Sequence, residues 1–152
     1  MGQSPKNVSD FFHTNSSFEF HQGKLMFTDT EIGISNKYAI NPSKITNGSS
    51  ILLCVRAPVG AINYCFRKIA IGRGLCSIEP KDKIDLDYLY YWLKYSKKYF
   101  LDNSTGSTFS AITIGTIKNA PFKYCPLNTQ INIKNKIKEA FKFLDIVKEQ
   151  II

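Results

Sequence analysis

The sequence predicts an α+β fold: a compact, β-rich unit of mixed or antiparallel strands with a few helices, followed by a long C-terminal helix. Three observations predict it. Short apolar runs divided by Gly and Pro fill residues 22–79, which is typical of strands. Apolar residues take up helical spacing after residue 85. With 152 residues, of which 43% are hydrophobic and 21% charged, the chain can form one globular core.

The clearest strand signal lies in the middle of the chain. The apolar runs 51–56 and 61–66 are joined by "APVG", which predicts a β-hairpin. Because the runs are continuous, we expect strands covered on both faces. Residues 1–21 are predicted to be irregular. Further short strands are predicted at 22–29, 35–40, 68–72 and 75–79.

A helix is predicted over 84–100, with Asp85 as its N-cap and lysines near its end. One face of this helix is an aromatic stripe made of Tyr88, Trp92, Tyr95 and Tyr99. Core packing against the sheet is the favoured role of the stripe, and stacking on nucleic-acid bases is the alternative. A short helix capped by Ser110 is predicted over 111–119.

The last predicted helix runs from about residue 128 to the end of the sequence. Its apolar residues recur at intervals of four and three, which is the spacing of a heptad seam. The seam consists of Ile133, Ile137, Ala140, Leu144, Val147 and Ile151. This helix is able to form a coiled coil with a partner helix, and packing back on its own domain is the alternative.

The charges are unevenly distributed along the chain, whose formal net charge is +8. Two long stretches contain no acidic residue. The stretch between Glu31 and Glu79 contains Lys37, Lys44, Arg56, Arg67, Lys68 and Arg73. The stretch between Asp102 and Glu139 contains Lys118, Lys123, Lys134, Lys136 and Lys138. Such stretches predict a surface that faces a polyanion, and a lysine-rich, solvated surface is the alternative.

The residue patterns of common catalytic sites are missing. Residues 103–122, "NSTGSTFSAITIGTIKNAPF", combine hydroxyls and glycines, but no Lys follows the glycines as a P-loop requires. The four cysteines lack the spacing of a zinc site and are predicted to be buried, reduced thiols. We therefore expect no catalytic residues, no metal and no cofactor. The sequence also shows neither a signal peptide nor an apolar run of the roughly 20 residues that span a bilayer, which predicts a cytoplasmic protein.

Three segments, in this order, resemble a known family. They are "MGQSPK" with "QGKLMF", then "ILLCVRAPVGAINY", then "STGSTFSAITIGTIKNAPFKYCPLNTQINIKNKI". Together they resemble a target recognition domain from the DNA specificity (S) subunit of type I restriction-modification systems, with the start of the helix that follows it. The resemblance covers nearly the whole chain. It implies a DNA target recognition domain at 1–126 and the start of a conserved spacer and dimerisation helix at 127–152.

The resemblance implies a non-catalytic module that recognises one half of a split DNA site and directs adenine methylation and restriction to it. The implied partners are double-stranded DNA, the modification methyltransferase subunit and the restriction subunit. The helix implies a homodimer, or pairing with a second recognition domain as an antiparallel spacer. In the family a short segment precedes "GQSP", and the helix usually begins P-L-x-E-Q, where this sequence has Thr129 at the Glu position. We therefore expect a half-subunit or a piece of a longer subunit.

The resemblance also implies which loops lie near DNA. The two loops "GQSP" and "QGK" contribute Gln3, Ser4, Gln22, Gly23 and Lys24. Gln suits base edges, whereas Lys and Ser suit phosphates. Arg56 is the first choice for a DNA contact because its guanidinium is a planar fork, and an ion-paired Arg at a strand end is the alternative. The remaining candidates are Arg67, Lys68, Arg73, Ser107 and Thr108.

A second hypothesis comes from another class of protein. A heptad seam on a small domain also fits a helix-mediated interaction or assembly protein whose basic surface is incidental. Binding to DNA separates the two hypotheses, because only the first requires it.

Overall fold

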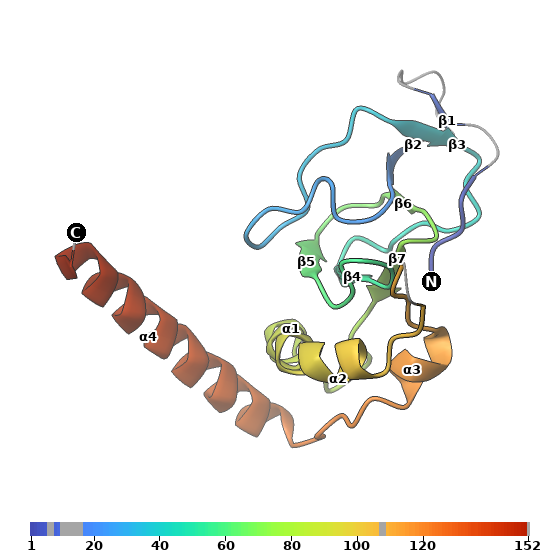
Figure 1. Ribbon diagram of the computed structural model, residues 1–152. Helices are drawn as coiled ribbons and strands as arrows, with labels where there is room; N and C mark the ends of the chain where they lie inside the picture. Colours follow the sequence, from blue (N-terminus) through green and yellow to red (C-terminus); the bar gives the residue numbers. More distant parts are fainter. Residues whose placement is uncertain (6–7, 10–16, 107–108, 152) are drawn as a thin grey trace.

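The computed structural model describes residues 1–5, 8–9, 17–106 and 109–151. These residues form three stacked layers, from which a long helix projects (Figure 1). A four-stranded sheet lies on a three-stranded sheet, and helices α1 to α3 cover the other side of the second sheet. The arrangement confirms the predicted α+β class with small sheets, a few helices and a long C-terminal helix.

The first sheet has the strand order β1-β3-β2-β6. Its strands are β1 (Val8–Ser9), β2 (Ser17–His21), β3 (Tyr38–Ile40) and β6 (Ala70–Ile71). β2 pairs antiparallel with β3 and parallel with β6, so it joins the N-terminal part of the chain to its middle. Phe20, Ala39 and Ala70 form a small core where these strands meet.

The second sheet has the antiparallel order β5-β4-β7. Its strands are β4 (Ser50–Cys54), β5 (Ile62–Cys65) and β7 (Leu75–Ile78). The β4–β5 pair confirms the predicted hairpin. Ile51 and Leu53 belong to the core on the helix side, whereas Leu52 and Cys54 belong to the core on the other side. Coverage of both faces explains why the β4 sequence is apolar without alternation.

Two helices replace the single helix predicted over 84–100: α1 (Leu86–Tyr95) and α2 (Lys97–Asp102). Asp85 caps α1 as predicted, because its side chain accepts a hydrogen bond from the Tyr88 N–H. Tyr88 is buried, and Trp92 and Tyr99 pack against the core, which confirms core packing for these members of the stripe. Tyr95 departs from this prediction, since its side chain is 86% exposed.

Three further predictions of secondary structure are wrong. Residues 1–21 are not irregular throughout, because β1 and β2 lie within them. Residues 22–29 are not a strand and contain a turn, closed by a hydrogen bond from the Phe27 N–H to the Lys24 carbonyl. The short helix α3 (Ile114–Lys118) is capped by Thr113 and not by Ser110. The Ser110 carbonyl accepts from the Ala57 N–H, so tertiary pairing holds this segment outside the helix.

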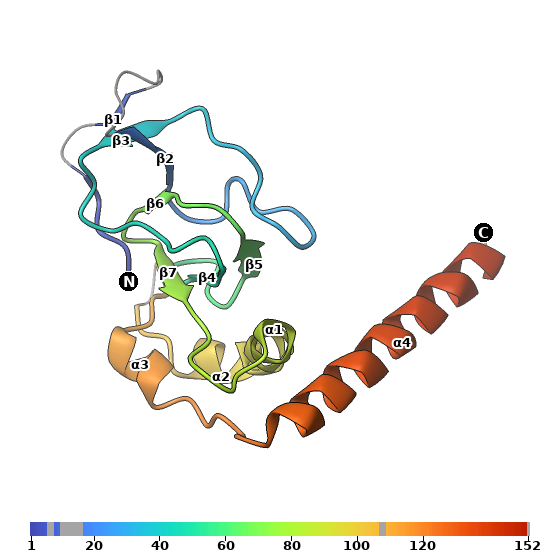
Figure 2. The same cartoon turned by 180° about the vertical axis from the view of Figure 1, so that it is seen from behind.

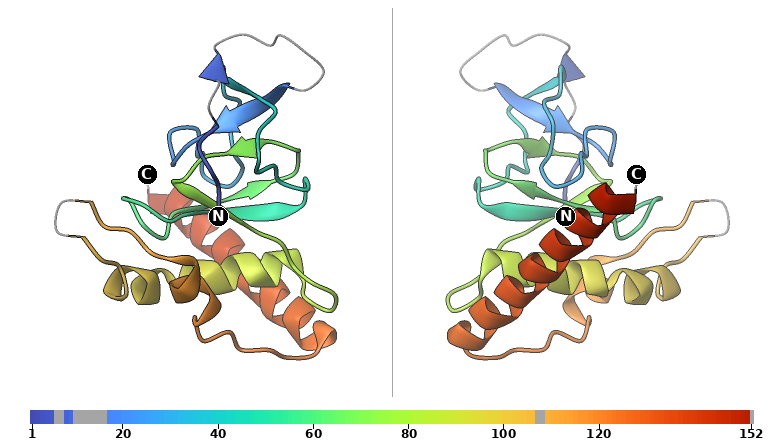
Figure 3. Two further views of the ribbon diagram at one scale, coloured as in Figure 1. Left: turned by 90° about the vertical axis from the view of Figure 1, so that its right-hand side faces the viewer. Right: turned by 90° about the vertical axis from the view of Figure 1, so that its left-hand side faces the viewer.

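The last helix, α4 (Leu127–Ile151), spans 25 residues, or about 37 Å at ~1.5 Å per residue. It crosses α1 obliquely (Figure 3) and then leaves the domain (Figure 1). The N-terminus of the chain and the far end of α4 lie on opposite sides of the molecule (Figures 1 and 2). None of the described helices combines the length and apolarity that a membrane span requires. α4 starts close to the predicted boundary at 126/127, and the functional division of the chain there stays a prediction.

Candidate nucleic-acid interface

Three segments that are distant in sequence meet at one place: the N-terminal residues, the loop after β2 and the turn between β6 and β7. The N–H groups of Gly2 and Gln3 donate to carbonyls at the start of β7 and the end of β6, at 2.8 and 3.0 Å. The Gly72 N–H donates to the His21 carbonyl at 2.8 Å, which brings the loop after β2 to the same turn. We call the resulting face the loop surface, and its members are Gln3, Ser4, Gln22, Gly23 and Arg73.

Glycines make this close approach of the loops feasible. A Cβ at Gly2 would collide with the carbonyl oxygen of Gly72. A Cβ at Gly74 would lie 3.1 Å from the backbone nitrogen of Gly23. "GRG" at 72–74 does not by itself indicate a functional turn, because two glycines so spaced are common. The turn could be predicted from the sequence only by considering its glycines together with those of "GQSP" and "QGK".

Gln3, Gln22 and Arg73 of the loop surface are exposed, and hydrogen bonds hold the side chains of Gln3 and Arg73. The Arg73 Nε donates to Ser4 Oγ at 3.2 Å, and the Ser43 hydroxyl donates to Gln3 Oε1 at 3.0 Å. Gln22 is exposed and borders a cavity of about 520 Å³, whose other polar lining includes Asn36 and Lys37. The surface therefore offers amide and guanidinium groups, which are the groups that read base edges in DNA.

Arg56 lies next to the same turn. The N–H of the preceding residue, Val55, donates to the Gly74 carbonyl at 2.9 Å, and Arg56 itself pairs with Ala111. Arg56 is exposed, and no described ion pair includes it, so the alternative of an ion-paired strand-end Arg finds no support. Ala111 pairs with both Arg56 and Thr105, whereas Ser107 and Thr108 lie outside the described residues.

Several basic candidates carry charge that is free to meet a polyanion. The ion pairs among the described residues include none of Lys24, Arg56, Lys68 and Arg73. All four side chains are exposed. Lys24 follows Gln22 and Gly23 in the loop after β2, whereas Lys68 lies between β5 and β6.

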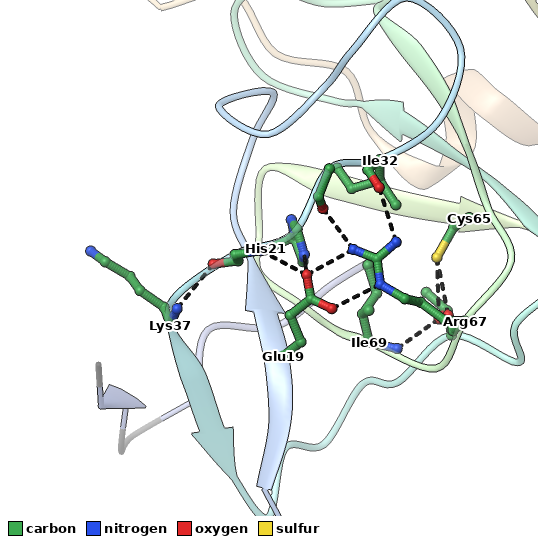
Figure 4. Close-up of polar contacts among 10 residues, drawn as sticks. Glu19, His21, Ile32, Lys37, Cys65, Arg67 and Ile69 are labelled. Atoms are coloured by element: carbon green, nitrogen blue, oxygen red, sulfur yellow. Dashed lines mark hydrogen bonds and ion pairs between the residues drawn. The ribbon is translucent and has the colours of Figure 1, made fainter. Parts of the chain in front are cut away.

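Arg67, by contrast, is committed to contacts within the protein (Figure 4). Its Nε and Nη2 donate to the two carboxylate oxygens of Glu19, each at 2.8 Å. Its Nη1 and Nη2 also donate to the carbonyls of Ile32 and Gly33, at 2.9 and 2.6 Å. The acid that pairs with Arg67 lies outside the acid-free stretch, which is why sequence reasoning placed this Arg among the DNA contacts. We correct that assignment: Arg67 ties β2 to the segment before β6.

Glu19 is the centre of this network. It also accepts from the Ser35 N–H at 2.7 Å, and its Oε1 lies 2.7 Å from the Nε2 of buried His21. Burial raises the pKa of the Glu19 carboxyl, but the hydrogen bonds from Arg67, Ser35 and His21 outweigh it and lower that pKa to about 2. Burial lowers the pKa of His21 against the opposing effect of Glu19, which favours the neutral ring. The carboxylate therefore stays charged and shapes the loop that follows β2.

The second acid-free stretch is also partly neutralised. Lys134 Nζ lies 2.6 Å from Asp85 Oδ2, and Lys138 Nζ lies 2.6 Å from Asp87 Oδ2. Both aspartates precede the stretch and belong to the start of α1. The fold thus brings acids from elsewhere in the chain to these two lysines, and the stretch carries less unpaired positive charge than its sequence indicates.

The heptad seam of α4 is largely uncovered. Ile133, Leu144 and Ile151 are 37%, 51% and 79% exposed. Only the first part of the seam approaches the domain: Ile133 and Ile137 line a cavity of about 550 Å³ with Trp92. The alternative of packing the whole seam back on its own domain is therefore not what the structure shows, and pairing with another helix stays a prediction.

The described part of the chain also contains thiols and other potential metal ligands. The described residues contain no group of three His, Cys, Asp or Glu side chains that could hold a metal ion. The cysteines are free thiols; Cys54, Cys65 and Cys76 are buried as predicted, whereas Cys125 is only half-buried. Burial raises the pKa of the Cys54 thiol to about 11, which keeps it protonated and unreactive at neutral pH.

These features define an α+β domain that combines a surface of clustered loops, rich in amide and basic groups, with a projecting amphipathic helix. The chain belongs to the family described as the type I restriction modification DNA specificity domain, because the family model matches residues 11–152.

Similar proteins and structures agree with this family. The chain is 32% identical, over 99% of its length, to a putative type I restriction enzyme MjaX specificity subunit from Methanocaldococcus jannaschii, of which it covers 35%. It resembles the crystal structure of the HsdS subunit from Thermoanaerobacter tengcongensis, with a TM-score of 0.80 and 27% identity over 99% of this chain and 36% of that one. A chain from a structure on complex assembly and conformational transition of the type I R-M system gives a TM-score of 0.82 and 29% identity, over 99% and 37% of the two chains. The chain thus spans about a third of the length of these relatives.

Proposed function

We propose that this chain is a DNA-recognising part of a type I restriction-modification specificity subunit, and that it has no catalytic role of its own. The observation that carries the proposal is the convergence of three loops into one surface of amide and guanidinium groups, in a chain whose family model covers residues 11–152. In this role the chain recognises one half of a split site and directs adenine methylation and restriction to it.

The proposed DNA contacts divide by chemistry. Gln3 and Gln22 carry amides that can donate and accept at the edge of adenine. Arg56 and Arg73 offer planar guanidinium forks for guanine or for phosphate. The groups better suited to the phosphate backbone are those of Ser4, Lys24, Lys68, Ser107 and Thr108, with the Gly23 backbone allowing close approach.

We also propose that the seam of α4 pairs with the helix of a second recognition domain, in a second copy or in a longer subunit. The spacing between successive seam residues is 4-3-4-3-4, which is the same in both directions along the helix. In an antiparallel pair, each seam residue therefore lies opposite a seam residue of the partner helix. The small Ala140 then faces the larger Leu144 of the other helix, which favours close packing. The modification methyltransferase and restriction subunits complete the proposed set of partners, in the cytoplasm.

Site selection tests the proposed function. The chain, together with the methyltransferase subunit of its own system, is incubated with a pool of randomised duplexes, and the bound fraction is sequenced. We expect enrichment of a short half-site, with reduced enrichment for Arg73→Ala and unchanged enrichment for Lys136→Ala, because Lys136 is exposed on α4. If no half-site is enriched with the wild-type chain, the proposal is wrong.

The exposed seam also supports the second hypothesis, an assembly protein that acts through its helix. That protein forms dimers or complexes through α4 and has no affinity for DNA. Sedimentation of the chain with and without a duplex separates the two hypotheses. Assembly without any co-sedimenting DNA supports the second.

A further inference from the structure

The start of α4 is fixed to the domain by a buried amide. Gln130 is 0% exposed, and its side chain makes three hydrogen bonds. Its Oε1 accepts from the Asp85 N–H at 2.9 Å, and its Nε2 donates to the carbonyls of Lys83 and Cys125 at 2.8 and 2.7 Å. Both Nε2 protons are thus used, and the first turn of α4 is tied to the residue that caps α1.

The contact continues along one face of α4. Lys134 reaches Asp85, and Lys138 reaches Asp87, with both nitrogen–oxygen distances at 2.6 Å. The Lys134 and Asp85 side chains are only 20% and 16% exposed, so solvent screens this pair weakly. One turn further on, the ring of Phe141 stacks on Tyr91 with centroids 6.3 Å apart.

This face is separate from the seam. An α-helix turns about 100° per residue, so residues 130, 134, 138 and 141 lie roughly a quarter turn from the seam. Beyond Phe141 the helix leaves the domain, and a cleft of about 690 Å³ lies between its outer half and the body, bordered by Tyr90 and Ile146 among others. The angle between α4 and the domain is therefore set at the start of the helix and not by packing along its whole length.

The same contacts connect to the sheet that carries the loop surface. Asp87 Oδ1 accepts from the hydroxyl of Tyr64 on β5 at 2.9 Å, while its Oδ2 meets Lys138. β5 pairs with β4, and β4 pairs with β7, which follows the turn of Arg73. A continuous series of hydrogen bonds thus runs from α4 to the proposed DNA contacts.

We propose that Gln130, Lys134 and Lys138 are positioning residues that fix the angle at which α4 leaves the domain, and hence the number of base pairs between the two half-sites that a paired assembly binds. We call these three residues the α4 anchor. The inference rests on the proposed function, because a gap between half-sites exists only if two recognition domains bind DNA together.

The test compares two double variants on the same helix with equal loss of charge. Lys134→Met with Lys138→Met removes the ion pairs of the α4 anchor. Lys136→Met with Lys142→Met removes two exposed lysines that no described ion pair includes. Gln130→Met serves as a second anchor variant. Each chain, with its methyltransferase subunit, selects from duplexes in which the gap between randomised half-sites varies by single base pairs.

Fluorescence supplies a readout that does not depend on DNA. Trp92 is the only Trp of the chain and lines a cavity with Ile133 and Ile137 of α4. We expect a red shift of its emission and stronger quenching by acrylamide in the anchor variants, because α4 moves away from α1. The control variant is expected to keep the wild-type spectrum.

In the selection we expect the wild type and the control to enrich one gap length, and the anchor variants to enrich the same half-sites over several neighbouring gap lengths. An unchanged gap in folded anchor variants overturns the inference and leaves the proposed function standing. Equal broadening in the control, or half-sites without a preferred gap in the wild type, also overturns it. Failure of the wild type to enrich any half-site overturns the proposed function, and the inference with it.

Discussion

Replacing Glu19 by Gln tests the network that holds the loop after β2. The Glu19 side chain is only 14% exposed, so its interactions are weakly screened. Folding lowers the pKa of its carboxyl from 4.5 to about 2, and each tenfold change in proton affinity corresponds to about 1.4 kcal/mol. The charged carboxylate therefore contributes on the order of 3 kcal/mol to the free energy of unfolding at neutral pH.

The sign of the pH dependence follows from the lowered pKa. The unfolded chain takes up the proton first as the pH falls, so the contribution is complete above about pH 4.5 and is lost as the pH approaches 2. Asp87 also has a lowered pKa, and its acid sensitivity remains when Glu19 is replaced. His21 contacts Glu19, so the loss of the carboxylate also changes the pKa of His21. The difference between wild type and Glu19→Gln therefore reports the contribution of Glu19 together with its contact to His21.

Urea unfolding followed by Trp92 fluorescence across this pH range measures the effect. We expect Glu19→Gln to be less stable at neutral pH by up to about 3 kcal/mol, and the gap to the wild type to close as the pH falls below about 4.5. Glu139→Gln is the control, because Glu139 is exposed on α4 and outside the described ion pairs. Parallel stability curves for wild type and Glu19→Gln below pH 4.5 would refute the reasoning.

Three further predictions concern DNA and the helix. If Arg73 reads a base, Arg73→Ala is expected to weaken binding to the selected duplex by roughly 1–3 kcal/mol. If Arg73 contacts phosphate, the variant binds all duplexes more weakly by the same amount. Titration with selected and shuffled duplexes distinguishes these outcomes. Arg67→Met is expected to lower the urea midpoint while leaving the slope of log affinity against log salt unchanged, whereas a phosphate contact would reduce that slope by about 0.9. Leu144→Asp is expected to abolish self-association in sedimentation without changing the unfolding of the domain. Asn135→Asp, an exposed position of α4, is the control. Association that survives Leu144→Asp contradicts the proposed seam.

The elements that were predictable from sequence depend on local signals. The β4–β5 hairpin is visible because two apolar runs flank a short turn, and Asp85 is visible as a cap because it directly precedes a helical period. β2 was missed because Ser17–His21 has no local strand pattern and is ordered by pairing with β3 and β6. A strand that is ordered by tertiary pairing leaves no recognisable pattern among its neighbours in sequence.

The candidate site was also predictable only in part. The two glutamine-bearing loops were predicted through the family resemblance, and the structure brings both to the β6–β7 turn. The acid-free stretches were misleading for Arg67, because its partner Glu19 lies 48 residues away in sequence. A basic stretch predicts local charge density, whereas the charge that remains available depends on which acids the fold brings to it. Lys24, Arg56, Lys68 and Arg73 remain outside the described ion pairs, and these four residues supply the basic groups of the proposed interface.

α4 illustrates why one helix can serve two contacts at once. Its seam was predictable because the period lies within the helix, but the α4 anchor was not, because its partners Asp85 and Asp87 lie 45 to 51 residues earlier. A helix that relied on its apolar seam for attachment to the domain would have to bury that seam there. Here a buried amide and two ion pairs attach the helix through a polar face, so the apolar face remains uncovered. Uncovered apolar surface of this extent gains free energy when it is buried, and a second helix of matching period is the partner that can bury it along its whole length.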